Sequence, residues 1–274
     1  MSSPTMVLNN GVEIPQLGLG VFKVPAAETE RVVRDALEIG YRHVDTAALY
    51  GNEEGVGAAV RASGCGRDEV FVTSKVWNDD QGYDATLRAF DRTMRLLGLD
   101  VLDLYLIHWP TPRRDRYVET WRALERLHTD GRIRAIGVSN FQPDHLRRLV
   151  DETEVVPAVN QVELHPYLQQ HDLRKTHDEL GIVTEAWGPI ARGGELLRDP
   201  VVSRLAEKHG RTPAQVVLRW HVQLGHVVIP KSVNAARMRE NLDVFGFELG
   251  EDDMAAIASL DRGERTGPDP DTMG

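Results

Sequence analysis

The feature that most constrains the fold is a strand-like segment followed by a helix-like segment, repeated along most of the 274 residues. Short runs rich in Val, Ile and Leu alternate with longer runs whose apolar residues recur at helical spacing. The predicted strands are 17–22, 43–47, 70–76, 102–109, 133–140, 157–164, 182–189 and 226–232. The predicted helices are 28–40, 52–63, 83–98, 116–131, 143–152, 170–181, a pair within 200–224, and 234–242.

Eight such units without a domain-scale linker predict an α/β fold, a (β/α)8 TIM barrel formed by one domain over residues 1–274. Barrels of this kind commonly take about 250 residues, and a hydrophobic content of 41% is enough for one large core. A doubly wound open sheet is the alternative. The ends add an N-terminal β-hairpin at 6–15 and extra C-terminal helices, the last within 248–260.

Two further expectations concern the chain ends. The Asn10-Gly11 dipeptide favours a type I′ turn in the hairpin, which we expect to plug one end of the barrel. The polar segment 262–274 has no periodic apolar face and is expected to form a mobile lip over the site.

Strand alternation indicates which polar side chains enter the barrel. In the strand 70–76 the even-numbered residues include three valines, and this face is expected to meet the helices. Lys75 then points into the barrel mouth. Asp45 ends the preceding strand, and neighbouring strands lie about 4.8 Å apart. His108 closes the fourth strand, and Tyr50 lies in the loop after the second. In α/β barrels, the C-terminal ends of the strands carry the active site.

These four side chains suit proton transfer to a carbonyl oxygen. A phenol with a pKa of about 10 is a poor acid at neutral pH, but an adjacent ammonium is expected to lower that pKa. Asp45 would hold Lys75 in place, and His108 would orient the carbonyl oxygen or share the proton relay. This arrangement is an acid without a metal, and it suits reduction of a carbonyl, in which a hydride arrives at carbon and a proton at oxygen.

The sequence also resembles a known family. GYRHVDTAALYGNEEGVG (40–57), KVWN (75–78), LYLIHWP (104–110), IGVSNF (136–141), VNQVELHP (159–166) and IPKSVNAARMREN (229–241) are similar to motifs of the aldo-keto reductases. The closest likeness is to bacterial 2,5-diketo-D-gluconate and methylglyoxal reductases. The resemblance implies a catalytic tetrad of Asp45, Tyr50, Lys75 and His108, with Tyr50 as the acid in reduction.

The segment IPKSVNAAR is the better candidate for holding a nucleotide cofactor. Neither Gly18-Leu19-Gly20 nor Gly55-Val56-Gly57 lies in the strand-turn-helix context of a dinucleotide fingerprint. Barrel phosphate sites often follow the last strands, beside a helix N-terminus. Lys231, Ser232 and Arg237 occupy that place and would suit the 2′-phosphate of NADPH.

The resemblance implies further cofactor contacts. Ser139, Asn140 and Gln161 would hold the nicotinamide amide, and Trp187 would stack on the ring. Gly188 stands where many relatives have Ser, which removes one hydroxyl contact. The remaining implied cofactor residues are Gly20, Val21, Gly188, Ile190, Val233, Asn234, Glu240 and Asn241.

The substrate pocket is expected to have apolar walls around the polar tetrad. Its predicted lining residues are Phe22, Ala47, Trp77, Asn78 and Trp109. The short polar tail lacks an aromatic rim for a large steroid. Small aldehydes, α-dicarbonyls and keto-sugars are therefore the expected substrates.

Composition excludes other classes of partner. The 32 Lys and Arg against 42 Asp and Glu give a formal net charge of −10, which opposes binding to nucleic acid and to anionic membranes. No run approaches the roughly 18 apolar residues of a membrane span. Cys65 is the only cysteine, so no intramolecular disulfide forms, and the first residues lack a leader pattern. The expectation is a cytoplasmic monomer.

Three functional alternatives follow from the sequence. The favoured one is NADPH-dependent carbonyl reduction, and the second is a non-catalytic barrel that binds the cofactor as a redox sensor. The third is a hydrolase or lyase that uses Asp45 and His108. A metal site is not expected, because we interpret the step Glu163-Leu164-His165 as placing its two ligand types on opposite strand faces.

Overall fold

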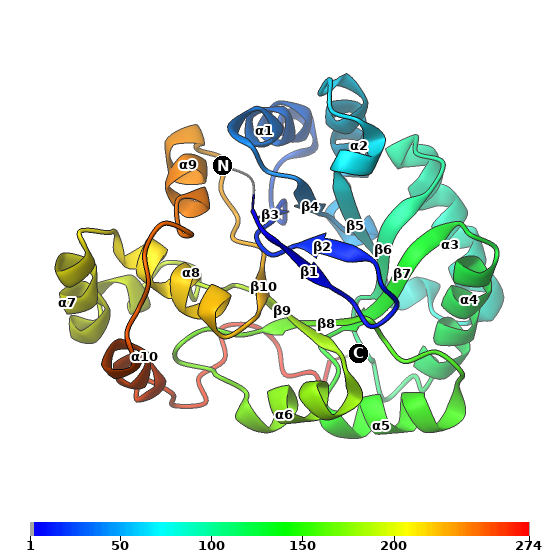
Figure 1. Ribbon diagram of the computed structural model, residues 1–274. Coiled ribbons are helices and arrows are strands. Elements are labelled where there is room, and N and C mark those ends of the chain that lie inside the picture. The colour runs from blue at the N-terminus through cyan, green and yellow to red at the C-terminus, as the bar shows by residue number, and fades with distance from the viewer. Residues whose placement is uncertain (1–2, 274) are drawn as a thin grey trace.

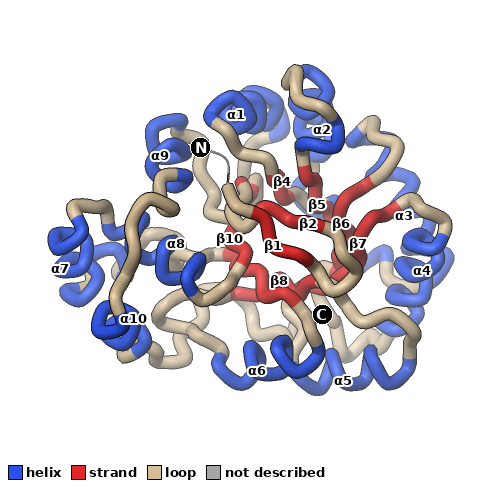
Figure 2. The backbone as a smooth tube through the Cα atoms, in the orientation of Figure 1, coloured by secondary structure: helices blue, strands red, loops and turns tan. Residues whose placement is uncertain are grey.

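The centre of the molecule is a parallel sheet of eight strands. The computed structural model describes residues 3–273 and has the strand order β10-β9-β8-β7-β6-β5-β4-β3. The strands are β3 (Leu19–Gly20), β4 (His43–Asp45), β5 (Phe71–Val76), β6 (Leu102–Ile107), β7 (Ile133–Ser139), β8 (Val159–Glu163), β9 (Val183–Trp187) and β10 (Val227–Val228). Figure 2 shows these strands at the centre, with the helices around them.

The first and last strands of this order join, which closes the sheet. Parallel bridges link Leu17 to Val228 and Gly20 to Lys231. The Gly18 N–H donates to the Val228 carbonyl at 2.8 Å across the same seam. The predicted barrel is therefore confirmed, and the open-sheet alternative is wrong.

Each strand is followed by at least one helix on the outside of the barrel (Figure 1). Helix boundaries follow local signals: α1 ends where Gly40 adopts a φ of 120°, and α8 begins with a capping box between Thr212 and Gln215. The helices are α1 (Ala26–Ile39), α2 (Glu53–Ala62), α3 (Tyr83–Leu97), α4 (Tyr117–Thr129), α5 (Pro143–Glu152), α6 (His171–Leu180), α7 (Pro200–His209), α8 (Pro213–Gln223), α9 (Ala235–Leu242) and α10 (Glu251–Ala258).

The N-terminal hairpin covers the end of the barrel opposite the site. Its strands β1 (Thr5–Val7) and β2 (Glu13–Pro15) pair in antiparallel fashion and lie across the barrel end in Figure 1. Leu8 and Ile14 pack against Phe71 and other residues at the N-terminal ends of the barrel strands. The hairpin thus plugs the barrel, as predicted.

The hairpin turn differs from the predicted one. A type I′ turn requires a positive φ at both central residues, but of the Asn10-Gly11 pair only Gly11 has one, at 84°. The Gly11 N–H donates to the Leu8 carbonyl at 2.9 Å, so the turn lies one residue earlier. The type I′ prediction is wrong because Gly11 closes the turn rather than forming its centre.

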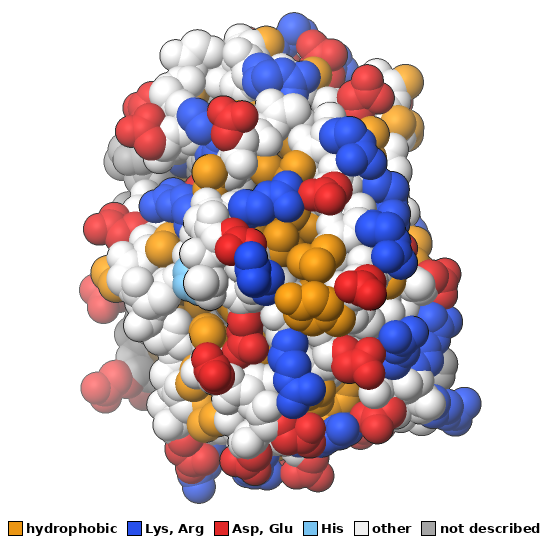
Figure 3. Space-filling model, turned by 90° about the vertical axis from the view of Figure 1, so that its right-hand side faces the viewer, with side chains coloured by type: hydrophobic (Ala, Val, Ile, Leu, Met, Phe, Trp, Pro, Cys, Tyr) orange, Lys and Arg blue, Asp and Glu red, His pale blue; other side chains and the backbone are white. Residues whose placement is uncertain are grey.

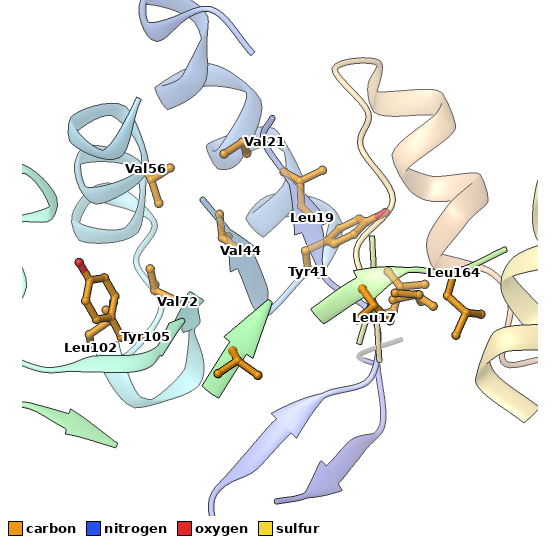
Figure 4. Packing of buried hydrophobic residues seen from close by; sticks show 14 of the residues in the cluster. Leu17, Leu19, Val21, Tyr41, Val44, Val56, Val72, Leu102, Tyr105 and Leu164 are labelled. Atoms are coloured by element: carbon orange, nitrogen blue, oxygen red, sulfur yellow. The ribbon is translucent and has the colours of Figure 1, made fainter. Parts of the chain in front are cut away.

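The alternation predicted for β5 is confirmed. Val72 and Val76 pack with the helices in the main core, where Figure 4 shows Val72 near Val44 and Val56. Phe71 joins the hairpin cluster inside the barrel, and Lys75 is fully buried there. The alternation of side chains along β5 thus places the Lys75 side chain inside the barrel.

The outer surface carries both signs of charge. On the face shown in Figure 3, Lys and Arg side chains are interspersed with Asp and Glu side chains around a patch of hydrophobic ones. Ion pairs such as Arg132 with Asp91, at 2.9 Å, contribute to this mixture. Within residues 3–273, no helix combines the length and the hydropathy that crossing a membrane would require.

Candidate active site

A buried ion pair lies at the C-terminal ends of β4 and β5. The Lys75 Nζ lies 2.7 and 2.8 Å from the two carboxylate oxygens of Asp45 and 2.9 Å from the Thr46 carbonyl. Both side chains are almost completely buried. Burial acts to lower the pKa of Lys75, but the charge and hydrogen bonds of Asp45, together with further contributions from Tyr50 and Glu185, outweigh it, and the pKa is raised. Lys75 is therefore a cation held in a fixed position.

Tyr50 lies next to this cation. It ends a 3-10 turn (Ala48–Tyr50) after β4, and its hydroxyl is 3.5 Å from Lys75 Nζ. Burial raises the pKa of the phenol, and Lys75 lowers it only in part, so the net shift is upward. The predicted lowering is wrong, because the ammonium contributes in the expected direction but desolvation is larger. The free site therefore keeps Tyr50 protonated.

His108 completes the group. It follows β6, and its ring stands edge-on to Tyr50 with 5.7 Å between centroids. Burial and the charge of Lys75 hold its pKa well below the usual 6.5, so the imidazole is neutral. Its Nδ1 has no hydrogen-bond partner among the described residues. The structure thus brings all four predicted residues together.

Amide and hydroxyl groups gather beside the tetrad, where the nicotinamide contacts were expected. The Ser139 hydroxyl donates to the Gln161 carbonyl at 2.7 Å, and the Asn140 amide donates to the His108 carbonyl at 2.9 Å. The Trp187 indole N–H donates to Asn140 Oδ1 at 2.8 Å. The side chains of Ser139, Asn140 and Trp187 thus form one connected cluster, which includes the backbone carbonyls of Gln161 and of the tetrad residue His108.

Sequence reasoning missed a second buried carboxyl group beneath the tetrad. The Gln161 amide nitrogen lies 2.8 Å from Asp45 Oδ2 and 3.1 Å from Glu185 Oε2. Burial, together with the charge of Asp45, raises the pKa of Glu185 to about 8. The signal was available, because Glu185 lies at an inward position of the alternating strand Val183–Trp187.

The predicted phosphate-binding residues surround the N-terminus of α9. The Asn234 side chain caps this helix by accepting from the Arg237 N–H at 3.1 Å. Lys231 and Arg237 are exposed beside it, and Ser232 is buried. A helix N-terminus flanked by free cations attracts phosphate.

The other predicted cofactor residues occupy different positions around the barrel mouth. Gly20 bridges to Lys231, and the Val21 N–H donates to the Asp45 carbonyl at 3.1 Å. Glu240 accepts from the Thr212 hydroxyl at 2.7 Å. The half-buried Gly188 and Ile190 follow β9, while Val233 is exposed before α9 and Asn241 is buried on α9.

The predicted substrate residues form an aromatic rim. The Phe22 ring lies 5.0 Å from that of Tyr50, and the Trp77 ring lies 5.1 Å from that of His108. Phe22 is 47% exposed, so its ring is accessible from outside. Ala47, Asn78 and Trp109 are buried behind this rim.

The C-terminal segment reaches the site through Glu163. The Glu163 carboxylate accepts from the backbone N–H groups of Thr266 at 2.7 Å and Gly267 at 3.0 Å. A Cβ atom added at Gly267 would overlap the ring of Trp187. The segment therefore lies against the indole that was expected to stack on a cofactor.

The expectation that Glu163 and His165 lie on opposite faces of a strand is wrong. Residues two apart share a strand face, and His165 Nε2 lies 3.2 Å from Glu163 Oε1. Among residues 3–273 there is no group of three or more His, Cys, Asp or Glu side chains placed to hold a metal. The contact is a two-residue hydrogen bond whose carboxylate also holds the C-terminal segment.

Comparison with known proteins places this geometry in context. Residues 16–262 match the model of the family described as "Aldo/keto reductase family". A Bacillus subtilis protein named glyoxal reductase is 53% identical over 270 residues, covering 98% of this chain and 97% of its own. A Yersinia pestis protein named methylglyoxal reductase is 50% identical over 272 residues, covering 99% and 98%. The crystal structure of a Gox0644 mutant in complex with NADPH is 53% identical, covers 100% of both chains and has a TM-score of 0.96.

Proposed function

Because the chain belongs to the aldo/keto reductase family, we propose that it uses NADPH to reduce small aldehydes and α-dicarbonyls to alcohols. Keto-sugars are the third substrate class in this proposal. The observation that carries it is the Tyr50 hydroxyl, 3.5 Å from a buried lysine that is paired with Asp45. Relatives at about half identity bear the names glyoxal reductase and methylglyoxal reductase.

In this proposal Tyr50 is the general acid. Its hydroxyl donates a proton to the carbonyl oxygen, and the positive charge of Lys75 stabilises the phenolate that remains. Neutral His108 offers a ring N–H to orient the same oxygen. The raised pKa of Tyr50 keeps the proton on the phenol until negative charge develops on the substrate. NADPH, when bound, supplies the hydride to the carbonyl carbon.

The chain's own residues fit such a cofactor at both ends. Ser139, Asn140 and Gln161 present hydroxyl and amide groups beside the tetrad, as a carboxamide requires. Exposed Lys231 and Arg237 flank the capped N-terminus of α9, as a 2′-phosphate requires. These two groups of residues would hold the nicotinamide and the phosphate respectively.

The apolar rim supports small substrates. Phe22, Trp77 and Trp109 supply aromatic walls, and a two- or three-carbon dicarbonyl needs few other contacts. We include a monomeric, cytoplasmic enzyme in the proposal, because the single Cys65 suits a reducing compartment. Light scattering of the purified protein tests the monomer.

The test follows NADPH oxidation by its absorbance with glyoxal, methylglyoxal, aromatic aldehydes and 2,5-diketo-gluconate. The wild type is compared with Tyr50→Phe, and NADPH binding is measured separately by fluorescence. We expect Tyr50→Phe to lose at least about 100-fold in kcat while still binding NADPH, because only the transferable proton is removed.

Three results would contradict the proposal. A wild type that binds NADPH but reduces none of these carbonyls would favour the sensor alternative. A Tyr50→Phe variant with near-normal kcat would exclude Tyr50 as the acid, and a wild type that binds no NADPH would overturn the cofactor assignment.

A further inference from the structure

Glu185 is a second carboxyl group inside the barrel, directly below the Lys75–Asp45 pair. It lies on β9, is fully buried, and accepts from Gln161 Nε2 at 3.1 Å through Oε2. The same nitrogen donates to Asp45 Oδ2 at 2.8 Å. An amide NH2 has two hydrogens, so Gln161 donates one to each of the two carboxyl groups. The Gln161 amide oxygen, Oε1, remains available to accept from other groups.

Among residues 3–273, no cation lies in contact with Glu185. Lys75 donates to both oxygens of Asp45. The nearest basic group to the other oxygen, Oε1, is His43 Nε2 at 3.8 Å. That ring nitrogen is itself 3.1 Å from the Thr73 hydroxyl, and burial lowers the pKa of His43 to about 3. His43 is therefore neutral and does not balance a charge on Glu185.

The charge balance of this closed space permits one anion. The groups facing Glu185 are His43 and Asp45 from β4, Thr73 and Lys75 from β5, and Gln161 from β8. With Asp45 ionised against Lys75 the cluster is neutral. A second carboxylate would leave an uncompensated charge in a site without solvent access, which is costly. Glu185 is the group that keeps its proton.

We propose that Glu185 is a positioning residue of the site: its neutral carboxyl fixes the Gln161 amide and leaves Asp45 as the only anion beside Lys75. The role in catalysis rests on the proposed reductase function, but the protonation of Glu185 does not. In this arrangement Gln161 Oε1 is directed away from the carboxyl groups and is free to accept from the carboxamide of NADPH.

A pH dependence follows. Burial and the charge of Asp45 raise the pKa of Glu185 to about 8, so Glu185 ionises as the pH rises through that value. The new negative charge acts to raise the pKa of both Tyr50 and Lys75. Tyr50 becomes a weaker acid. We expect the wild-type kcat for carbonyl reduction to fall roughly threefold between pH 7 and pH 9.

The proton on Glu185 also affects the stability of the protein without cofactor or substrate. An unfolded Glu has a pKa of about 4.3, below the folded value, so the folded state binds an extra proton between these two values. Stability is therefore lost as the pH rises from about 4.3 to about 8. Glu185→Gln has no ionisable group there and lacks this loss. We expect its Tm minus that of the wild type to grow by at least about 5 °C between pH 5 and pH 8.5.

The experiment measures Tm against pH for the NADPH-free protein, then kcat against pH and the Kd for NADPH. Glu185→Gln should flatten the fall of kcat above pH 8 and leave the Kd within about twofold, since an amide oxygen still accepts from Gln161. Glu185→Leu removes that acceptor and should weaken NADPH binding roughly threefold to tenfold.

Glu53→Gln is the matched control. Glu53 is another buried carboxyl group whose pKa burial raises, but it lies outside the barrel, where it accepts from Ser74 at 2.6 Å. Its replacement should alter how Tm depends on pH, but it should change neither the dependence of kcat on pH nor the affinity for NADPH. A Tm difference for Glu185→Gln that stays flat with pH would show Glu185 ionised throughout and overturn the proposal, whatever the enzyme reduces. If Tm responds but the protein shows no reductase activity, only the proposed function fails.

Discussion

At the scale of single residues, replacing only one partner of the Lys75–Asp45 pair is predicted to lower the free energy of unfolding. Lys75→Met leaves the Asp45 carboxyl group buried without its cation, with the Gln161 amide as a remaining polar side-chain contact. We expect a loss of about 3–5 kcal/mol in the free energy of unfolding, measured in urea at pH 7. Adding Asp45→Asn should restore part of the loss. If the double variant is no more stable than Lys75→Met, the loss of stability comes from packing and not from the unpaired carboxyl group.

The same residues show what strand alternation can and cannot predict. A period of two placed Lys75 inside the barrel, and the same argument applied to Val183–Trp187 would have placed Glu185 there too. The pKa direction of Tyr50 was not predictable. It depends on how deeply the phenol is buried beside Phe22 and His108, and loop packing of that kind leaves no periodic signal.

At the scale of elements, the C-terminal segment is predicted to be held by one carboxylate. Glu163 accepts from the backbone of Thr266 and Gly267 beside Trp187. Glu163→Gln replaces one acceptor oxygen with a donor, so hydrogen exchange at these two amides should accelerate roughly tenfold. Gly267→Ala should have the same effect through its overlap with Trp187. Unchanged exchange in both variants would show that other contacts hold the segment.

Element order was predictable because each strand and helix has its own periodicity, but strand lengths were not. Residues 17–22 and 226–232 were predicted as full strands, whereas β3 covers Leu19–Gly20 and β10 covers Val227–Val228. Their outer residues meet through isolated bridges such as Leu17 with Val228. The seam of a barrel depends on distant pairing, which local sequence does not encode.

At the scale of the whole molecule, acid stability reflects histidines buried in several elements. Burial lowers the pKa of His43, His177 and His221 to about 3 each. Unfolded histidine has a pKa of about 6.5, so the unfolded chain binds more protons between these values. Stability contributed by these groups is present above about pH 6.5 and is lost as the pH falls toward 3. The buried carboxyl groups of Asp45, Glu53 and Glu185, whose pKa values are raised, act in the opposite sense. The lowered pKa values of His108 and His226 add to the effect of the three histidines.

The resulting prediction is that the wild-type Tm falls by roughly 5–10 °C between pH 7 and pH 5. Two variants on α6 form a matched pair. His177 is buried between Asn160 and Thr184 at 2.8 Å from each, whereas the His171 side chain is 61% exposed. His177→Gln removes one proton-binding site of the unfolded chain and should reduce the fall, even if its Tm at pH 7 is lower. His171→Gln should leave the fall unchanged. Equal falls in both variants would mean that His177 does not contribute to the acid response.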